Sequence, residues 1–333
     1  MRFASTFRNG GLARAGGAAV LGCVLAAAQA AVLPAQAPPA ATYRARTDLV
    51  VLQVAVTDAR HRYVPGLRAE DFVVYEDGAP QEIVVFESAA APLDVMLLMD
   101  TSGSMGGRLD VAQRAAIGLV EMLRPGDRAG LVVFNTSAEF AHPLSEERDR
   151  VAAAVRRTSP AGATALYEAL YLALKALPRA QQPGDIRRQA LVVLSDGADN
   201  YSRIPFDHVL EAAGAGDVTI FTILLGPSAM GYPLGPNQRW DDAAARFEMR
   251  RLAEDTGGRM FIATHLGELA HVYEQIGNEL REQYWLAYAP ATVRPGFRRV
   301  SVRVIQPAGL QARTRAGYEA SRRAPPPTPR ATP

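Results

Sequence analysis

The stretch MLLMDTSGSMGGRLD, residues 96–110, decides the fold and raises the question of function. Its apolar run ends on Asp100, and small hydroxyl residues and glycines follow directly. A strand buried in a protein core has no need of an aspartate, and a plain turn has no need of two serines spaced two residues apart. The pattern therefore predicts a core strand that delivers oxygen atoms to one point at its carboxyl end.

Alternating strand and helix patterns surround this stretch. Apolar runs at 93–100, 129–135, 189–196, 217–226 and 258–264 are separated by segments of helical periodicity. Helices are expected at 109–123, 146–157, 164–177, 206–215, 243–256 and 266–281. Such alternation predicts an α/β domain over 91–281, a doubly wound, mostly parallel sheet with helices on both faces. A Gly/Pro-rich loop at 226–241 interrupts the series.

The segments that flank this domain have strand character instead. Residues 47–90 contain two β-type runs around Asp77-Gly78, which is a strong hairpin signal. Residues 282–320 again read as strands. Each segment is too small to bury a core alone, so we expect the two to pair as a small β-sandwich into which the α/β domain is inserted. The Pro-rich tail at 321–333 is expected to be disordered.

The N-terminal segment resembles a targeting sequence. Residues 1–37 contain three arginines and no acidic residue. They also contain an Ala-rich apolar run, which small-x-small sites follow. This pattern predicts a secretory signal peptide at 1–37 and a linker at 38–46, and so a secreted or periplasmic protein. The alternative is an uncleaved membrane anchor that leaves the chain facing the periplasm. Cleavage would remove Cys23, the single cysteine, and with it disulfides and thiol catalysis.

Charge and composition exclude further classes. Without residues 1–37 the chain has 33 basic against 34 acidic residues, which gives no electrostatic case for nucleic-acid binding. Hydrophobic content of 48% and charged content of 21% are typical of a globular protein. P-loop and nucleophile-elbow motifs are absent from the sequence, and its five histidines form no HExxH pattern.

A set of five oxygen-bearing residues remains. Ligands of open α/β sheets bind at the carboxyl ends of the strands. Asp100 and Asp196 each end an apolar run, and Ser102, Ser104 and Thr164 lie in the segments beside them. All five offer hard oxygen ligands, which select Mg²⁺, Mn²⁺ or Ca²⁺ over zinc or copper. Hydroxyl-rich ligation with two carboxylates favours Mg²⁺.

The same residues resemble a known family. DTSGSM matches the Asp-x-Ser-x-Ser element of the metal-ion-dependent adhesion site in von Willebrand factor type A domains, GATAL supplies its threonine and SDG its second aspartate. The resemblance covers about residues 92–280. It implies that the two serines and the threonine contact the ion, and that the aspartates often hold it through water. The flanks VPGLRAEDFVVYEDGAPQEI and YWLAYAP are similar to the borders of a bacterial subfamily of secreted proteins with this domain.

Three functions fit the sequence. The first is a non-enzymatic protein-binding module, which uses no small-molecule cofactor and presents the cation to a Glu or Asp carboxylate of a partner protein. The second is a metal-dependent hydrolase, such as a phosphatase, in which Asp100 is the nucleophile. The third is an envelope assembly protein with a purely structural metal. A simpler interpretation of Asp100 and Asp196 is turn formation or helix capping after a strand. The first function is favoured because no general base or cofactor loop accompanies the five residues.

Overall fold

The computed structural model describes residues 49–88, 91–180, 187–196, 199–226, 238–292 and 294–320. The chain divides into two units, 1–46 and 47–333, and all described residues belong to the second. The predicted signal peptide at 1–37, the linker at 38–46 and the tail at 321–333 lie outside the described residues. Among the described helices, none combines the length and apolar character that crossing a bilayer requires.

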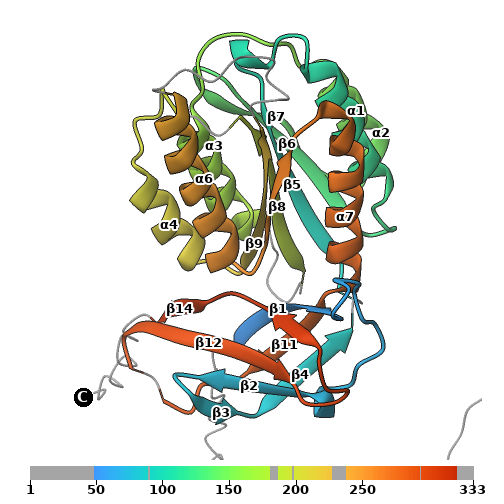
Figure 1. Ribbon diagram of the computed structural model, residues 1–333, viewed down its shortest axis with the longest axis vertical. Coiled ribbons are helices and arrows are strands. Elements are labelled where there is room, and N and C mark those ends of the chain that lie inside the picture. Colours follow the sequence, from blue (N-terminus) through green and yellow to red (C-terminus); the bar gives the residue numbers. More distant parts are fainter. Residues whose placement is uncertain are drawn as a thin grey trace, which may run out of the picture. The chain divides into compact units, whose positions relative to one another are not determined.

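Six strands form a central sheet in the order β10–β9–β8–β5–β6–β7 (Figure 1). All neighbours pair in parallel except β6 and β7, which are antiparallel. The strands are β5 (Leu93–Asp100), β6 (Arg128–Phe134), β7 (Ala138–Ser145), β8 (Arg188–Ser195), β9 (Val218–Leu225) and β10 (Met260–Ala263). The predicted fold class, a mostly parallel sheet of this type, is confirmed.

Helices cover both faces of this sheet (Figure 1). They are α1 (Leu109–Glu121), α2 (Arg148–Arg156), α3 (Leu166–Ala176), α4 (Phe206–Gly214), α6 (Gln238–Asp255) and α7 (Leu269–Glu282). Alternate residues of β5 serve the two faces: Val95 and Leu97 pack into the core under α1, α2 and α7, while Met96 and Leu98 pack under α3, α4 and α6. A strand buried on both faces explains why the run before Asp100 is continuously apolar.

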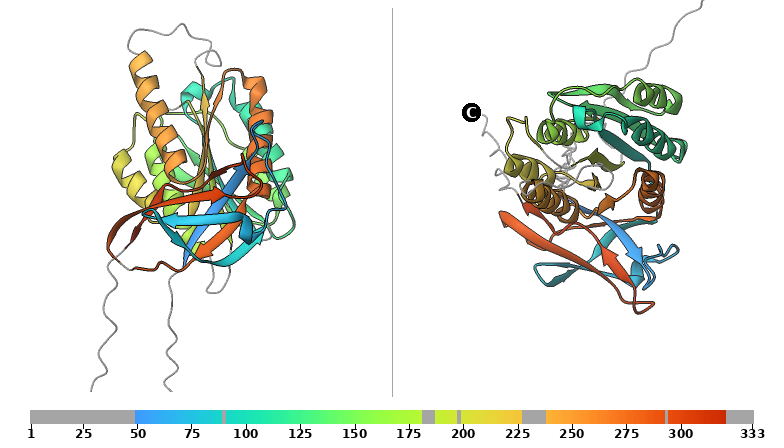
Figure 2. Two further views of the ribbon diagram at one scale, coloured as in Figure 1. Left: turned by 60° about the horizontal axis from the view of Figure 1, so that its bottom comes forward. Right: turned by 45° about the horizontal axis from the view of Figure 1, so that its top comes forward.

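The flanking segments pair with each other, as predicted. Two antiparallel sheets form, in the orders β13–β1–β11–β4 and β14–β12–β2–β3. Their strands are β1 (Val50–Thr57), β2 (Phe72–Glu76), β3 (Ala79–Gln81), β4 (Ile83–Ser88), β11 (Tyr284–Tyr288), β12 (Gly296–Val304), β13 (Gln311–Arg313) and β14 (Gly317–Ala320). N-terminal β1 thus pairs with C-terminal β11, and β2 with β12. The chain enters the α/β domain through β5 and leaves it through α7 at the same end, next to the sandwich (Figures 1 and 2).

Two local features show where the sequence pattern succeeds and where it fails. Asp77 and Gly78 have φ angles of 47° and 84°, the positive values that a tight type I′ hairpin requires. Strand β7, in contrast, was not expected. Half of its residues, Pro143 among them, are exposed and the others are only partly buried, so neither an apolar run nor alternation marks it. It is an edge strand, the position in a sheet where proline is tolerated.

Candidate metal centre

Two neighbouring strands bring the predicted aspartates to one edge of the sheet. β5 ends at Asp100, and Asp196 directly follows the last residue of β8. The register pairs Met99 with Leu194, so Asp100 lies level with Ser195. The Ser195 hydroxyl donates a 2.8 Å hydrogen bond to Asp100 Oδ2 and fixes that carboxylate.

The loop after Asp100 folds back on the aspartate. The Ser102 amide donates to Asp100 Oδ1 at 2.9 Å. The hydroxyl oxygens of Ser102 and Ser104 lie 2.8 Å apart, so these two predicted ligands face each other. Met105, whose side chain is fully buried, anchors the short 3₁₀ turn Gly103–Met105 in the core.

The two carboxylates are close enough to influence each other. Asp100 is fully buried, and this burial together with the negative charge of Asp196 raises the pKa of Asp100 to about 6. Asp196 Oδ1 is also buried and accepts no hydrogen bond from the described residues. A carboxylate oxygen buried without a donor, next to a second carboxylate, is costly unless a cation balances it. The donor set therefore fits a hard divalent cation.

Thr164 reaches the same edge on a separate loop. The Ala161 amide donates to the Thr101 carbonyl at 2.7 Å, and the Gly103 amide donates to the Gly162 carbonyl at 3.0 Å. These bonds hold the Thr164 loop against the Asp100 loop. Thr164 is 3% exposed, and no hydrogen bond from the described residues occupies its hydroxyl.

Asp199 and Asn200 hold the threonine loop and the start of α3 in place through hydrogen bonds. Asn200 Oδ1 accepts the Thr164 amide at 2.9 Å, and the Asn200 amide donates to the Thr164 carbonyl at 3.1 Å. Asp199 accepts hydrogen bonds from the Ser202 hydroxyl and the Tyr167 amide at the start of α3. Both residues therefore position the threonine loop. Their place two and three residues after SDG was the available signal.

Carboxylates alone do not make this centre. Within the described ranges, no group of three or more His, Cys, Asp or Glu side chains could hold a metal ion. The candidate centre depends on hydroxyl oxygens in addition to Asp100 and Asp196.

Gly162 has a backbone conformation that a side chain would strain. Its φ is +74°, and a Cβ at this position would lie 2.2 Å from the Thr136 hydroxyl. We expect Gly162→Ala to lower the free energy of unfolding by about 1–2 kcal/mol from the left-handed backbone alone, measured by urea denaturation. Gly118→Ala is the control, because a Cβ there meets nothing within 4 Å inside α1 and should stabilise by about 0.5–1 kcal/mol. Equal stability of the two variants would contradict the prediction.

Comparison with known proteins finds similarity over part of the chain. The chain is 32% identical over 200 residues to a UPF0353 protein of Mycolicibacterium paratuberculosis, an alignment that covers 56% of this chain. The chain spans 60% of the length of that relative. Among solved structures, a von Willebrand factor type A protein from Catenulispora acidiphila aligns at 15% identity over 83% of this chain and 75% of its own, with a TM-score of 0.47. BatB from Bacteroides thetaiotaomicron aligns at 20% identity over 56% of this chain and 98% of its own, with a TM-score of 0.44. Residues 95–198 match the family model of the von Willebrand factor type A domain.

Proposed function

We propose that the chain is a non-enzymatic binding module that presents Mg²⁺ to an acidic side chain of a partner protein. Proteins with von Willebrand factor type A domains mediate protein–protein interactions, some of them through a bound metal. The observation that carries the proposal is the buried Asp100 carboxylate and the buried Oδ1 of Asp196, beside the facing hydroxyls of Ser102 and Ser104.

Each of the five residues has a defined part in the proposal. Asp100 and Asp196 offset the charge of the ion, while Ser102, Ser104 and Thr164 offer neutral oxygen ligands. Neutral ligands leave the cation electrophilic, and Mg²⁺ usually retains exchangeable waters. When bound, the ion supplies a Lewis-acidic position that a partner carboxylate can occupy in place of a water. Mn²⁺ or Ca²⁺ could bind the same oxygen donors.

The hydrolase alternative has less support. A nucleophilic aspartate must reach its substrate, but Asp100 is fully buried and each of its oxygens accepts a hydrogen bond, one from Ser102 and one from Ser195. A location outside the cytoplasm, secreted or in the periplasm, is part of the proposal and depends on the targeting pattern of residues 1–37.

The pH dependence of metal binding provides one test. Because the pKa of Asp100 is raised to about 6, Mg²⁺ must compete with a proton below that pH, and its affinity should fall by up to about tenfold per pH unit. The metal-free chain should respond in the opposite direction. In the folded, metal-free chain the pKa of Asp100 exceeds its ordinary value of 3.8. Protonation of Asp100 therefore makes the fold more stable as pH falls from about 6 to about 4. Melting temperatures at pH 5 and 7.5, with and without Mg²⁺, measure both effects; an Mg²⁺ effect of equal size at the two pH values would contradict the first.

Partner capture tests the function itself. Immobilised full chain is incubated with envelope extract in Mg²⁺ or in EDTA, beside an Asp100→Ala chain. We expect specific proteins to be retained by the unmodified chain only in Mg²⁺. Retention that survives both EDTA and the substitution would instead favour the structural alternative, an assembly role that does not use the metal for contact.

A further inference from the structure

A groove of about 240 Å³ opens directly beside the candidate metal centre. Thr101, Val133 and Ala154 lie in its interior, and the exposed residues Glu139, Arg157 and Ser159 are at its rim. Glu139 belongs to β7, the antiparallel edge strand, and Arg157 directly follows α2. The groove therefore lies between the edge of the central sheet and the end of the helix that packs over it.

Thr101 links the groove to the loop of the metal centre. This residue follows Asp100, and its hydroxyl donates to the Phe134 carbonyl at 3.1 Å and accepts a 3.4 Å hydrogen bond from the Asn135 amide. An extended peptide advances about 3.3–3.6 Å per residue. A partner segment whose acid reaches the metal would therefore have a neighbouring residue close to this groove, because Thr101 lines the groove and follows Asp100.

The rim of the groove carries two opposite charges that do not neutralise each other. Within the described part of the chain, neither the Glu139 carboxylate nor the Arg157 guanidinium has an ion-pair partner, and the two do not form a pair together. The C-terminal end of α2 carries a partial negative charge, which favours a cation and accounts for both Arg156 and Arg157. The helix end does not account for the negative charge of Glu139 on β7.

A rim of this kind discriminates by repulsion as well as by attraction. An acidic side chain in the groove would be attracted by Arg157 and repelled by Glu139, and a basic side chain would meet the reverse. An uncharged amide has an N–H that the carboxylate can accept and a carbonyl that can accept from the guanidinium, so neither group repels it. We propose that this groove is a second partner subsite, which accepts an Asn or Gln side chain of the segment whose acid binds the metal. The inference rests on the proposed function.

Selection from a peptide library tests this subsite. Nonapeptides with a fixed central glutamate and random flanks are displayed on phage, bound to the full chain in Mg²⁺ and eluted with EDTA. For the unmodified chain we expect enrichment of Asn or Gln at one fixed offset from the glutamate. Glu139→Lys should change the preference at that offset to Asp or Glu, and Arg157→Glu should change it to Lys or Arg. Each change should be up to about fivefold, the upper end of the range for an exposed charge contact.

Two substitutions near the groove control for a nonspecific effect of surface charge on peptide binding. Arg156→Glu and Glu146→Lys change exposed residues that do not line the groove, and both should select the same peptides as the unmodified chain. Mg²⁺-dependent peptides without any preferred offset, or an unchanged preference in Glu139→Lys and Arg157→Glu, would overturn the subsite while leaving the proposed function standing. A library with no EDTA-sensitive binders would overturn both.

Discussion

Mg²⁺ is expected to raise the melting temperature of the chain, and Asp100→Ala should abolish this rise. Ligand at 100 times its dissociation constant stabilises a fold by about 2.7 kcal/mol. One kcal/mol corresponds to about 2–4 °C for a domain of 150–250 residues, so the shift should be about 5–10 °C. Removing the Asp100 carboxylate takes away half of the charge that balances the ion. Thermal unfolding of each chain with Mg²⁺ and with EDTA measures the effect.

Melting temperatures with Mg²⁺ and with EDTA are compared for the same variant. A change in the metal-free stability of a variant therefore does not affect the measured shift. Asp110→Asn is the matched control: this aspartate lies ten residues further along, is exposed and pairs with Arg114 on the surface of α1. The Asp110→Asn variant should retain the full rise in melting temperature in Mg²⁺. A melting temperature of the unmodified chain that is indifferent to Mg²⁺, Mn²⁺ and Ca²⁺ would contradict the metal-binding proposal.

The sequence predicted the features that depend on local pattern. The continuous apolar run before Asp100 indicated a strand buried on both faces, and the alternation of strands and helices indicated a parallel sheet. Asp77-Gly78 predicted a hairpin, because few residues other than glycine, asparagine and aspartate adopt positive φ readily. The pairing of the flanking segments followed from their size, since neither could bury a core alone.

Features that depend on register between distant strands left no such pattern. Ser195 fixes Asp100 only because β8 lies beside β5 with Met99 level with Leu194. Asn200 holds Thr164 across 36 positions of the chain. Strand β7 is stabilised by pairing with β6 rather than by an apolar face of its own, so its sequence resembles a loop.

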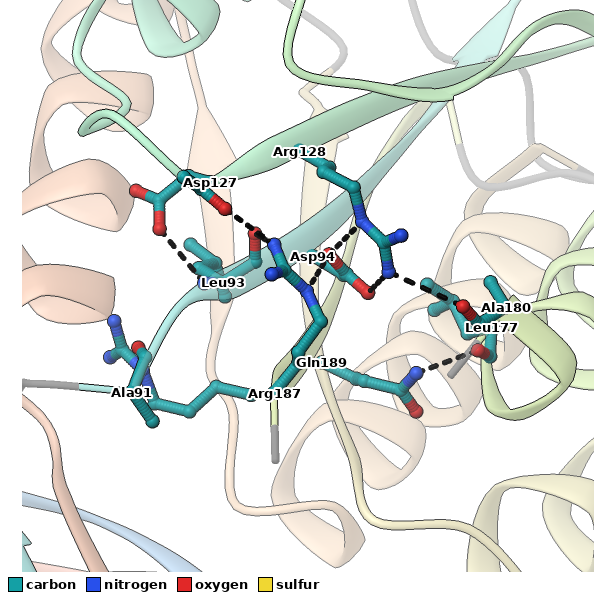
Figure 3. A network of polar contacts seen from close by, with 11 residues as sticks. Ala91, Leu93, Asp94, Asp127, Arg128, Leu177, Ala180, Arg187 and Gln189 are labelled. Carbon is teal, nitrogen blue, oxygen red and sulfur yellow. Dashed lines mark hydrogen bonds and ion pairs between the residues drawn. The ribbon is translucent and has the colours of Figure 1, made fainter. Parts of the chain in front are cut away.

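Asp94 is a second aspartate in the same strand, and the sequence offered no account of it. It lies at the start of β5, opposite the metal edge, and its side chain is fully buried. Arg128 Nε donates to Asp94 Oδ1 at 2.8 Å, and Arg187 Nε donates to the same oxygen at 2.7 Å (Figure 3). One carboxylate thus serves two guanidinium groups from the starts of β6 and β8.

Asp94→Asn should therefore be the most destabilising conservative change in this strand. Asparagine keeps the shape of the side chain but removes the negative charge that Arg128 and Arg187 share. Arg187 is 8% exposed, so its charge is poorly solvated once the carboxylate is gone. Breaking a buried pair by removing one partner costs about 3–5 kcal/mol, and we expect a loss of that size in urea denaturation.

The same experiment separates the two ends of β5. Asp94→Asn should lower stability yet preserve the Mg²⁺ shift, whereas Asp100→Ala should abolish the shift, because the two carboxylates lie at opposite edges of one sheet. Asp110→Asn should change stability by less than about 1 kcal/mol, since its ion pair is exposed. Adding Arg187→Met to Asp94→Asn should restore part of the loss, because an apolar side chain removes one buried charge. If Asp94→Asn were as stable as the Asp110→Asn control, the carboxylate could not be what holds the three strand starts together.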